Sequence, residues 1–347
     1  MSTPPAPSVS APVDDFHGEN PPPSGPVLRA DTPSRGVVVS CYRWGPGEWD
    51  NPETMPALLA ELRSLGVDAI QIHPYAQISR DGAVTYRPGP VTPATVKPLR
   101  WARERGLSTL LKPHLAYWGS GFAWRGDITF TTEDQWQRFF RTYTDFIVHQ
   151  ARLAAVADAD LFAVGTELHL TLHREADWRR VIAQVRAVYP GRLTYAANWN
   201  EYADVPFWDA LDYVGVQAYF PLSPASSPTD QQLIAGWQPV RTDLRALSAR
   251  HQKPVLLTEL GYAVSEAAAR EPWSDALVGD PDAAAQLKLR CMRIALEQIA
   301  DEPVIHGVYL WKWFPGNRDH ADEFVLQYDP MRRIIRSAWQ DPAADPR

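Results

Sequence analysis

Cysteine is scarce in this sequence. The 347 residues include two cysteines, Cys41 and Cys291, which lie far apart and each within an apolar segment. This scarcity excludes a disulfide framework, and two isolated thiols do not form the paired pattern of a zinc site. We therefore predict that both are buried, reduced thiols that pack as small hydrophobic side chains and have no catalytic role.

The sequence also lacks an excess of positive charge and long hydrophobic runs. Its formal net charge is -7 and its isoelectric point is about 5.7. Nucleic-acid binding usually needs clustered Lys and Arg, so no nucleic-acid partner is expected. Apolar runs such as "VDAIQI" fall far below the roughly 18 residues of a membrane span, and the N-terminus lacks the features of a secretory signal. We predict no membrane partner and a cytoplasmic location.

Proline, in contrast, is abundant near the N-terminus. Residues 1–35 hold nine of the 32 prolines and almost no aliphatic pattern. Such a segment buries too little apolar surface to offset the entropy lost on ordering, so we predict a disordered tail over residues 1–35. The whole chain is 45% hydrophobic and 11% aromatic, enough to fill a large core. We assign residues 36–340 to a single folded domain.

From residue 36 onward, short apolar runs alternate with longer amphipathic stretches. Near-continuous hydrophobicity is typical of parallel strands buried on both faces. The predicted strands are 36–42, 67–74, 107–114, 161–167, 192–198, 213–219, 254–259 and 304–311. The predicted helices are 52–65, 92–105, 132–157, 175–189, 204–211, 230–251, 282–301 and 331–339. The first helix has clear end signals, with Asn51 placed as its N-cap and Gly66 after its last turn.

Eight strand-then-helix units predict a single (β/α)₈ TIM barrel of the α/β class. A doubly wound sheet would normally stop at about five or six strands. The long segments 115–131, 220–229 and 260–281 follow strands and are predicted as βα loops. Active sites of such barrels lie at the C-terminal rim that these loops form. The side chains at the strand ends are therefore the candidates for a functional site.

Two predicted strands, the fourth and the seventh, end in Thr-Glu, at Glu167 and Glu259. A lone strand-end Glu is more often an ion-pair partner or a cap than a catalyst. A pair across a barrel mouth instead suits glycoside cleavage, which needs one protonated carboxyl and one ionised carboxylate. We expect burial and the charge of Glu259 to raise the pKa of Glu167. Tyr219 is the nearest candidate hydrogen-bond donor to Glu259.

Other side chains at the strand ends are candidates for substrate binding, because tryptophans in loops suit the flat apolar faces of sugars. The predicted substrate-binding residues are Tyr42, Trp44, His73, Lys112, His114, Asn198, Trp199, Tyr219 and Trp311. His73, which precedes a proline, fits a buried core histidine equally well. Lys112 and His114 leave the third strand at alternate positions beside a Trp-rich loop, where donors for sugar hydroxyls would be useful.

Several of these strand ends resemble those of the clan A retaining glycoside hydrolases. The motifs are "LLKPHL" at the third strand, "VGTELH" at the fourth, "VGVQAYF" at the sixth, "VLLTELGY" at the seventh and "GVYLWKW" at the eighth. They are most similar to glycoside hydrolase family 113, whose characterised members are β-mannanases. The resemblance spans about residues 36–315 and implies a substrate of β-1,4-mannan or manno-oligosaccharides.

The resemblance also implies roles for single residues. Glu167 matches the general acid/base of the clan and Glu259 its nucleophile. Tyr219 matches the tyrosine that hydrogen-bonds the nucleophile, and Trp311 the aromatic floor under the sugar at the cleavage point. One position departs from the pattern: many members of the clan have Asn directly before the acid/base, where it binds the sugar 2-hydroxyl, and here the residue is Thr166.

Two further groups of residues invite other roles. His169 and His173 have the i, i+4 spacing that can hold a metal ion. No third ligand is evident and a retaining glycosidase needs no metal, so we predict no metal and no other cofactor. Glu48, Glu201 and Glu266 are acidic loop residues that we expect to be solvated rather than catalytic.

The leading hypothesis is a retaining β-glycoside hydrolase that acts by double displacement on a carbohydrate substrate. One alternative is a carbohydrate-binding barrel without turnover, and another is a β-glycosidase of different sugar specificity, because one fold supports many specificities. A metal-dependent barrel hydrolase is a further alternative, which a chelator would inactivate. The sequence assigns no oligomeric state.

Overall fold

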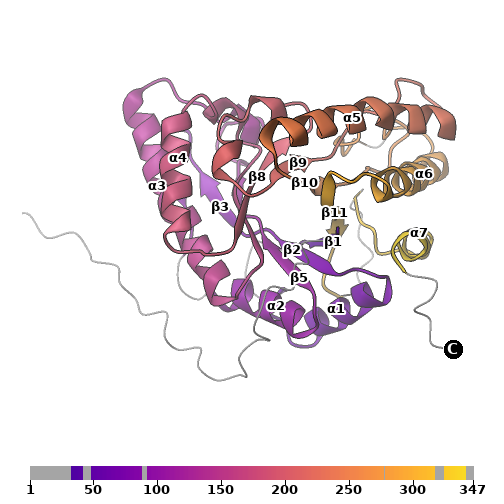
Figure 1. Cartoon of the computed structure of the whole chain (residues 1–347), viewed down its shortest axis with the longest axis horizontal. Helices are drawn as coiled ribbons and strands as arrows, with labels where there is room; N and C mark the ends of the chain where they lie inside the picture. Colours follow the sequence, from indigo (N-terminus) through magenta and orange to yellow (C-terminus); the bar gives the residue numbers. More distant parts are fainter. Residues whose placement is uncertain (1–32, 42–47, 88–91, 277, 317–323, 341–347) are drawn as a thin grey trace, which may run out of the picture.

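The barrel predicted from the sequence is present and closed. The computed structural model describes residues 33–41, 48–87, 92–276, 278–316 and 324–340. Eight parallel strands form the barrel in the order β1-β11-β10-β9-β8-β7-β5-β2, and helices surround it (Figure 1). The strands are β1 (Ser34–Val39), β2 (Ala69–Ile72), β5 (Ser108–Leu111), β7 (Leu161–Thr166), β8 (Arg192–Asn198), β9 (Val214–Gln217), β10 (Val255–Leu260) and β11 (Ile305–Trp313).

The α-helices of the described residues follow the strands along the chain. They are α1 (Thr54–Ser64), α2 (Thr92–Glu104), α3 (Glu133–Val156), α4 (Glu175–Arg186), α5 (Asp230–His251), α6 (Pro281–Ala300) and α7 (Asp329–Trp339). Capping boxes at Thr132 and Thr229 satisfy the first backbone N–H groups of α3 and α5. In the part of the chain that the structure describes, no helix is both long enough and apolar enough to cross a bilayer.

One predicted helix and the predicted end of the tail were wrong. The helix expected over 204–211 is replaced by two short 3₁₀ turns, η3 (Tyr202–Asp204) and η4 (Trp208–Ala210). Pro206 lies between them, and the residue before it, Val205, has extended backbone angles, as a following proline favours. Strand β1 begins at Ser34, so Ser34 and Arg35, which we assigned to the tail, belong to the barrel. Residues 1–32 of the predicted tail lie outside the described residues.

A small second sheet lies at the C-terminal ends of β2 and β5. It contains β3 (Tyr75–Ile78), β4 (Val84–Thr85) and β6 (His114–Ala116) in the order β4-β3-β6. The sequence analysis treated 115–131 as a plain loop and missed β6. Strand β3 pairs in parallel with β6, with Tyr75 opposite His114. The pairing fixes these two side chains side by side at the barrel mouth.

The barrel interior is filled rather than hollow. Its buried side chains form a separate apolar cluster, which includes Val38, Ala69, Leu110, Leu161, Ala163, Leu256 and Tyr309. Gly36 makes room for the largest of them, because a Cβ at this position would lie 2.4 Å from the ring of Tyr309. A packed interior leaves the C-terminal mouth as the place for a site, as is usual for this fold.

Candidate active site

One large cavity opens at the C-terminal ends of the barrel strands. Its volume is about 1020 Å³. This is slightly above the range of roughly 300–1,000 Å³ that is usual for ligand sites. The residues predicted for the site that line it are His114, Glu167, Asn198, Trp199, Tyr219, Glu259 and Trp311. Tyr42 and Trp44, also predicted, lie outside the described residues. The barrel therefore brings residues from six strands or their following segments to one place.

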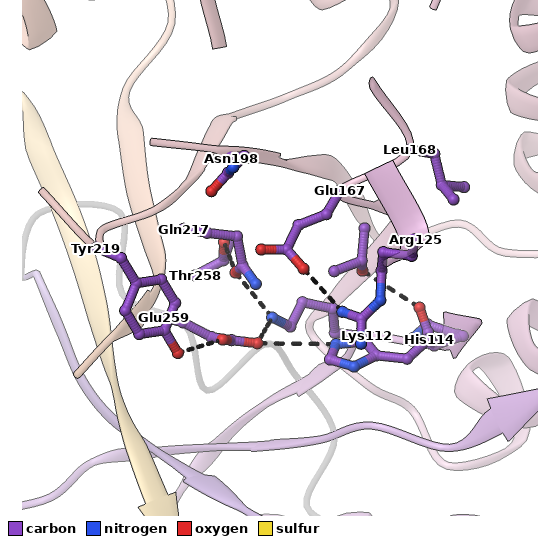
Figure 2. Close-up of polar contacts among 12 residues, drawn as sticks. Lys112, His114, Arg125, Glu167, Leu168, Asn198, Gln217, Tyr219, Thr258 and Glu259 are labelled. Atoms are coloured by element: carbon purple, nitrogen blue, oxygen red, sulfur yellow. Dashed lines mark hydrogen bonds and ion pairs between the residues drawn. The ribbon is translucent and has the colours of Figure 1, made fainter. Parts of the chain in front are cut away.

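Glu259, in β10, is held at both carboxylate oxygens. The Tyr219 hydroxyl donates a 2.7 Å hydrogen bond to Oε2, and the Lys112 ammonium contacts Oε1 (Figure 2). His114 lies close to the same group, with Nε2 3.8 Å from Oε1. Tyr219 is thus the hydrogen-bond donor that the sequence analysis expected. A buried carboxylate with one cationic and one neutral donor is held in a single orientation.

Lys112 does not occupy the position expected of a sugar ligand. It is 0% exposed, and its Nζ also donates to Gln217 Oε1 at 2.9 Å. Burial lowers the pKa of Lys112, while the contact with Glu259 opposes this effect. Since breaking a buried ion pair leaves an uncompensated charge, the pair of Lys112 and Glu259 depends on both members. The structure therefore indicates a role for Lys112 in supporting Glu259.

Gln217, the last residue of β9, is a site residue that the sequence analysis missed. Its Oε1 accepts hydrogen bonds from Lys112 and, at 2.8 Å, from the Thr258 hydroxyl. The side chain is completely buried. It lies inside the apolar run "VGVQAY", where a single buried glutamine among aliphatic residues was the available signal. The amide fixes the ammonium of Lys112 under Glu259.

Glu167 follows β7 directly and turns out of the strand. Its backbone has φ 53°, in the left-handed region, and its N–H donates to the Ala196 carbonyl at 2.8 Å. Arg125 Nη1 donates to Glu167 Oε2 at 2.9 Å. Burial raises the pKa of Glu167; Arg125 opposes the rise, and the negative charge of Glu259 adds to it. The direction and both predicted causes agree with the sequence analysis.

Arg125 is the second site residue that the sequence analysis missed. It begins the 3₁₀ turn η1 (Arg125–Asp127), in the long loop that follows β6, and it lines the cavity. Arg125 does not lie at the end of a predicted strand. The available signal was an arginine between Trp124 and Gly126 in a long βα loop. It supplies the charged partner of Glu167.

Thr166, the departure from the clan pattern, is turned into the barrel wall. The side chain is 2% exposed, and its hydroxyl donates to the Pro113 carbonyl oxygen at 3.3 Å. The hydroxyl is therefore engaged within the protein. Asn198, from the end of β8, lines the cavity and appears near Glu167 in Figure 2. The amide of Asn198 is therefore a polar group in the cavity lining.

His73 and His114 form a stack of imidazoles beside Trp311. The ring centres of the two histidines lie 5.0 Å apart, and His73 lies 5.2 Å from the Trp311 ring. Burial, together with nearby Lys112 and Arg125, lowers the pKa of both histidines well below the ordinary value. Both imidazoles are therefore neutral. The sequence left two roles open for His73, a core histidine or a substrate ligand, and its buried position fits a core histidine. His114, in contrast, lines the cavity.

Two stacked pairs of aromatic side chains line the cavity. Trp199 stacks on Trp273, with ring centres 5.2 Å apart and planes 14° from parallel. Tyr117 stacks on Trp118 at 5.0 Å. Trp118 is 52% exposed and Trp273 is 45% exposed, which is unusual for such large apolar side chains. Exposed, stacked indoles beside a polar cavity suit the carbon-hydrogen faces of sugar rings.

Comparison with known proteins identifies the family. The sequence pattern of Glycoside Hydrolase Family 113 matches residues 41–324, which is most of the chain. The chain belongs to this family. It is therefore a glycoside hydrolase, and the resemblance noted in the sequence is confirmed.

Solved structures agree with the family 113 fold. The β-mannanase AaManA of Alicyclobacillus acidocaldarius, in complex with ManMIm, has a TM-score of 0.76 and 24% identity, over 89% of this chain and 97% of that one. A complex of a family 113 β-1,4-mannanase has a TM-score of 0.73 and 21% identity, over 88% and 98% of the two chains. The endo-β-1,4-mannanase of Thermotoga petrophila is more distant, with a TM-score of 0.59 and 12% identity over 93% and 80%. No curated protein matches this chain by sequence.

Glu201 corrects one of our expectations about this family 113 chain. We expected a solvated loop carboxylate, but Glu201 lines the cavity and is half-buried. Its Oε2 lies 3.7 Å from His169 Nδ1, and burial raises its pKa. His173, the other histidine considered for a metal, instead has Nδ1 2.9 Å from the Leu170 carbonyl oxygen. Within the described residues, no three His, Cys, Asp or Glu side chains come together as metal ligands.

The two cysteines are unpaired, as expected. Cys291 is buried, but Cys41 is only half-buried and contributes to the cavity lining, which corrects the prediction of burial for this residue. Burial raises the pKa of each thiol to about 12. Both therefore remain protonated near neutral pH, where the thiol is a poor nucleophile.

Proposed function

We propose that this family 113 protein is a retaining β-glycosidase that cleaves β-1,4-mannan or manno-oligosaccharides. One observation carries the proposal: Glu167 and Glu259, from the ends of β7 and β10, line the same cavity, and their carboxyl groups have different partners. Glu167 has a raised pKa because it is buried, whereas Glu259 has a lysine ammonium and a tyrosine hydroxyl on its oxygens. Two carboxyl groups in contrasting environments suit an acid and a nucleophile.

In the first step, an ionised Glu259 attacks the anomeric carbon of the sugar. The bond from that carbon to the leaving oxygen breaks, and Glu167 gives its proton to this oxygen. Tyr219 and Lys112 orient the attacking carboxylate through their contacts with its oxygens. The product is a glycosyl ester of Glu259.

In the second step, Glu167 acts as a base. It takes a proton from a water molecule, whose oxygen bonds to the anomeric carbon. The bond to Glu259 breaks, and its electron pair returns to the carboxylate. Two inversions at the same carbon give net retention of configuration.

The choice of mannosides rests on the family and its relatives. The printed names of the two family 113 structures describe β-mannanases, at 21% and 24% identity to this chain. The stacked aromatic pairs at the cavity, Trp199 with Trp273 and Tyr117 with Trp118, support an elongated sugar chain. The same barrel and carboxylate pair can serve other β-linked sugars, so specificity needs its own test.

Substrate and stereochemistry can be tested together. We suggest incubating the protein with β-linked manno-, gluco-, galacto- and xylo-oligosaccharides and following the first product anomer by proton NMR. We expect cleavage of the manno series with the β-anomer formed first. An α-anomer formed first would overturn the retaining mechanism, and preferred cleavage of another series would overturn the mannoside assignment.

Variants then separate an enzyme from a binding protein. Glu259→Ala is expected to abolish turnover, and Glu167→Gln to slow poor leaving groups far more than good ones. Glu53→Gln, an exposed carboxylate on the surface, is the matched control. A non-catalytic binding barrel would show no turnover in the unaltered protein and would keep its sugar affinity in Glu259→Ala. Loss of activity in a chelator would instead support the metal-dependent alternative.

A further inference from the structure

The ion pair of Arg125 and Glu167 joins a permanent cation to a group that must carry a proton in half of its reaction cycle. Arg125 Nη1 lies 2.9 Å from Glu167 Oε2, and both side chains are largely buried (Figure 2). An arginine stays charged at every working pH. This contact stabilises the ionised form of Glu167, the form that acts as a base.

The guanidinium of Arg125 is held in place by its own loop. Its central carbon lies 5.9 Å from the centre of the Tyr117 ring, on the ring face. The next residue, Gly126, lies against Trp124 so closely that a Cβ would be 2.3 Å from the indole. Arg80 anchors the same loop four residues before Arg125 by donating from Nη1 to the Gly121 carbonyl at 2.9 Å. The loop therefore presents Arg125 to Glu167 in a fixed position.

Other groups around Glu167 act on its proton in opposite directions. Burial and the negative charges of Glu259 and Glu201 favour the neutral carboxyl, whereas Arg125 and Lys112 favour the carboxylate. The amide of Gln217 also favours the carboxylate. The hydroxyls of Tyr75, Tyr195 and Tyr219 also interact with Glu167, and burial keeps all three protonated. The cation hydrogen-bonded to Glu167 is Arg125.

We propose that Arg125 is a positioning residue that stabilises and orients the ionised form of Glu167 for the second step of the reaction. This inference rests on the proposed function. In that step the carboxylate of Glu167 takes a proton from water, the water oxygen bonds to the anomeric carbon, and the electron pair of the broken ester bond returns to Glu259. Arg125 favours the form that starts this step and opposes the protonated form that starts the first one.

The experiment compares Arg125→Met and Arg125→Lys with the unaltered protein. Glu167 must be protonated on the basic limb of the kcat/KM profile. In Arg125→Met this limb should move up by about one pH unit. The reason is that an opposite charge at this distance lowers a carboxyl pKa by roughly one unit or more. With a dinitrophenyl mannobioside, whose turnover the second step limits, the acid limb of kcat should move up as well. At pH 5, kcat should fall on the order of tenfold, which is the change in ionised fraction for one pKa unit. Arg125→Lys should restore part of both shifts.

A purely structural role predicts a different result. The control Arg80→Met removes an anchor of the same loop but leaves the guanidinium beside Glu167, and it should move neither limb. Equal shifts in Arg80→Met, or a uniform loss of rate in Arg125→Met with both limbs in place, would overturn the proposal. A selective loss of sugars that carry a carboxylate would also overturn it, since Arg125 would then be a substrate ligand.

A direct titration separates this proposal from the proposed function. The Glu167 carboxyl can be followed by carbon-13 NMR of glutamate-labelled protein, assigned by difference with Glu167→Gln. Its midpoint should rise in Arg125→Met whether or not mannosides are the substrate. An unchanged midpoint would overturn the role of Arg125, whereas absent cleavage of all β-glycosides would overturn the proposed function alone.

Discussion

The hydroxyl of Tyr219 donates a 2.7 Å hydrogen bond to Oε2 of Glu259. The other oxygen of this carboxylate contacts the ammonium of Lys112, which Gln217 holds from behind at 2.9 Å. Each oxygen of Glu259 therefore has its own donor. The contacts come from β9 and β10 and from the end of β5, so the closed barrel is what brings them to one carboxylate.

Tyr219→Phe should reduce kcat/KM on an aryl β-mannobioside by about tenfold or more, because a hydrogen bond to a charged group contributes roughly 1.5–3 kcal/mol. The fold should be retained, since the phenylalanine ring keeps the packing against Phe324. Initial rates and circular dichroism measure the two effects. Tyr86→Phe, which removes a remote hydroxyl at the Asp145 carbonyl, is the control and should keep full activity. Equal activity in both variants would contradict a role of Tyr219 at the nucleophile.

Lys112→Met should destabilise the protein as well as inactivate it. Removing one partner of a buried ion pair costs about 3–5 kcal/mol, because the other charge is left uncompensated. The double variant Lys112→Met with Glu259→Gln should be more stable than the sum of the single changes predicts. Urea unfolding of the four proteins gives this interaction free energy. Strictly additive costs would show that the contact does not couple the two residues.

The pH dependence of stability should report the buried carboxyl of Glu167. Burial raises the pKa of Glu167 in the folded state above the value of about 4.3 in the unfolded chain. The folded state then binds more protons in this window, so its free energy of unfolding should decline as pH rises through the raised pKa. Glu167→Gln, which resembles the protonated form, should remove this decline. Urea unfolding from pH 4 to 8 measures it; parallel curves for the two proteins would contradict the assignment.

Trp273→Ala should weaken binding of long substrates more than short ones. Trp273 stacks on Trp199 at the edge of the cavity and is 45% exposed, so it is placed to contact a sugar unit away from the cleavage point. We expect KM for a manno-oligosaccharide of five or six units to rise about tenfold, the effect of losing roughly 1.4 kcal/mol. KM for an aryl β-mannobioside should change little. Leu170→Ala, another exposed apolar side chain, is the control; equal increases for short and long substrates would count against an outer sugar site at Trp273.

Local patterns were sufficient to predict the barrel. Each strand is a short apolar run and each helix an amphipathic stretch, several with end signals, so the alternation could be read segment by segment. The prediction of a helix over 204–211 was wrong because Pro206 lies inside the segment and interrupts a helix there. The short rim strand His114–Ala116 was not predicted, because its pairing partner, Tyr75–Ile78, lies far away in the sequence.

The candidate site divides in the same way. Glu167, Glu259 and Tyr219 end or follow apolar strands, and the regularity of the barrel places such positions at one rim. Arg125 belongs to a 3₁₀ turn in a long loop, and no periodicity relates that turn to the mouth of the barrel. Glu201 follows a strand end, but its loop turns it toward the cavity wall and not toward solvent. Loop geometry decided both of these positions.

The sequence by itself determined the strand order along the chain, the two carboxylates and their family, because local hydrophobic periodicity and short motifs carry that information. Tertiary structure alone decided which charge lies beside each carboxylate. Lys112 contacts Glu259, which lies 147 residues away in the sequence. Arg125 contacts Glu167, which lies 42 residues away. Contacts of this kind depend on barrel closure and loop conformation, and the resulting burial and distances set the proton affinity of each group.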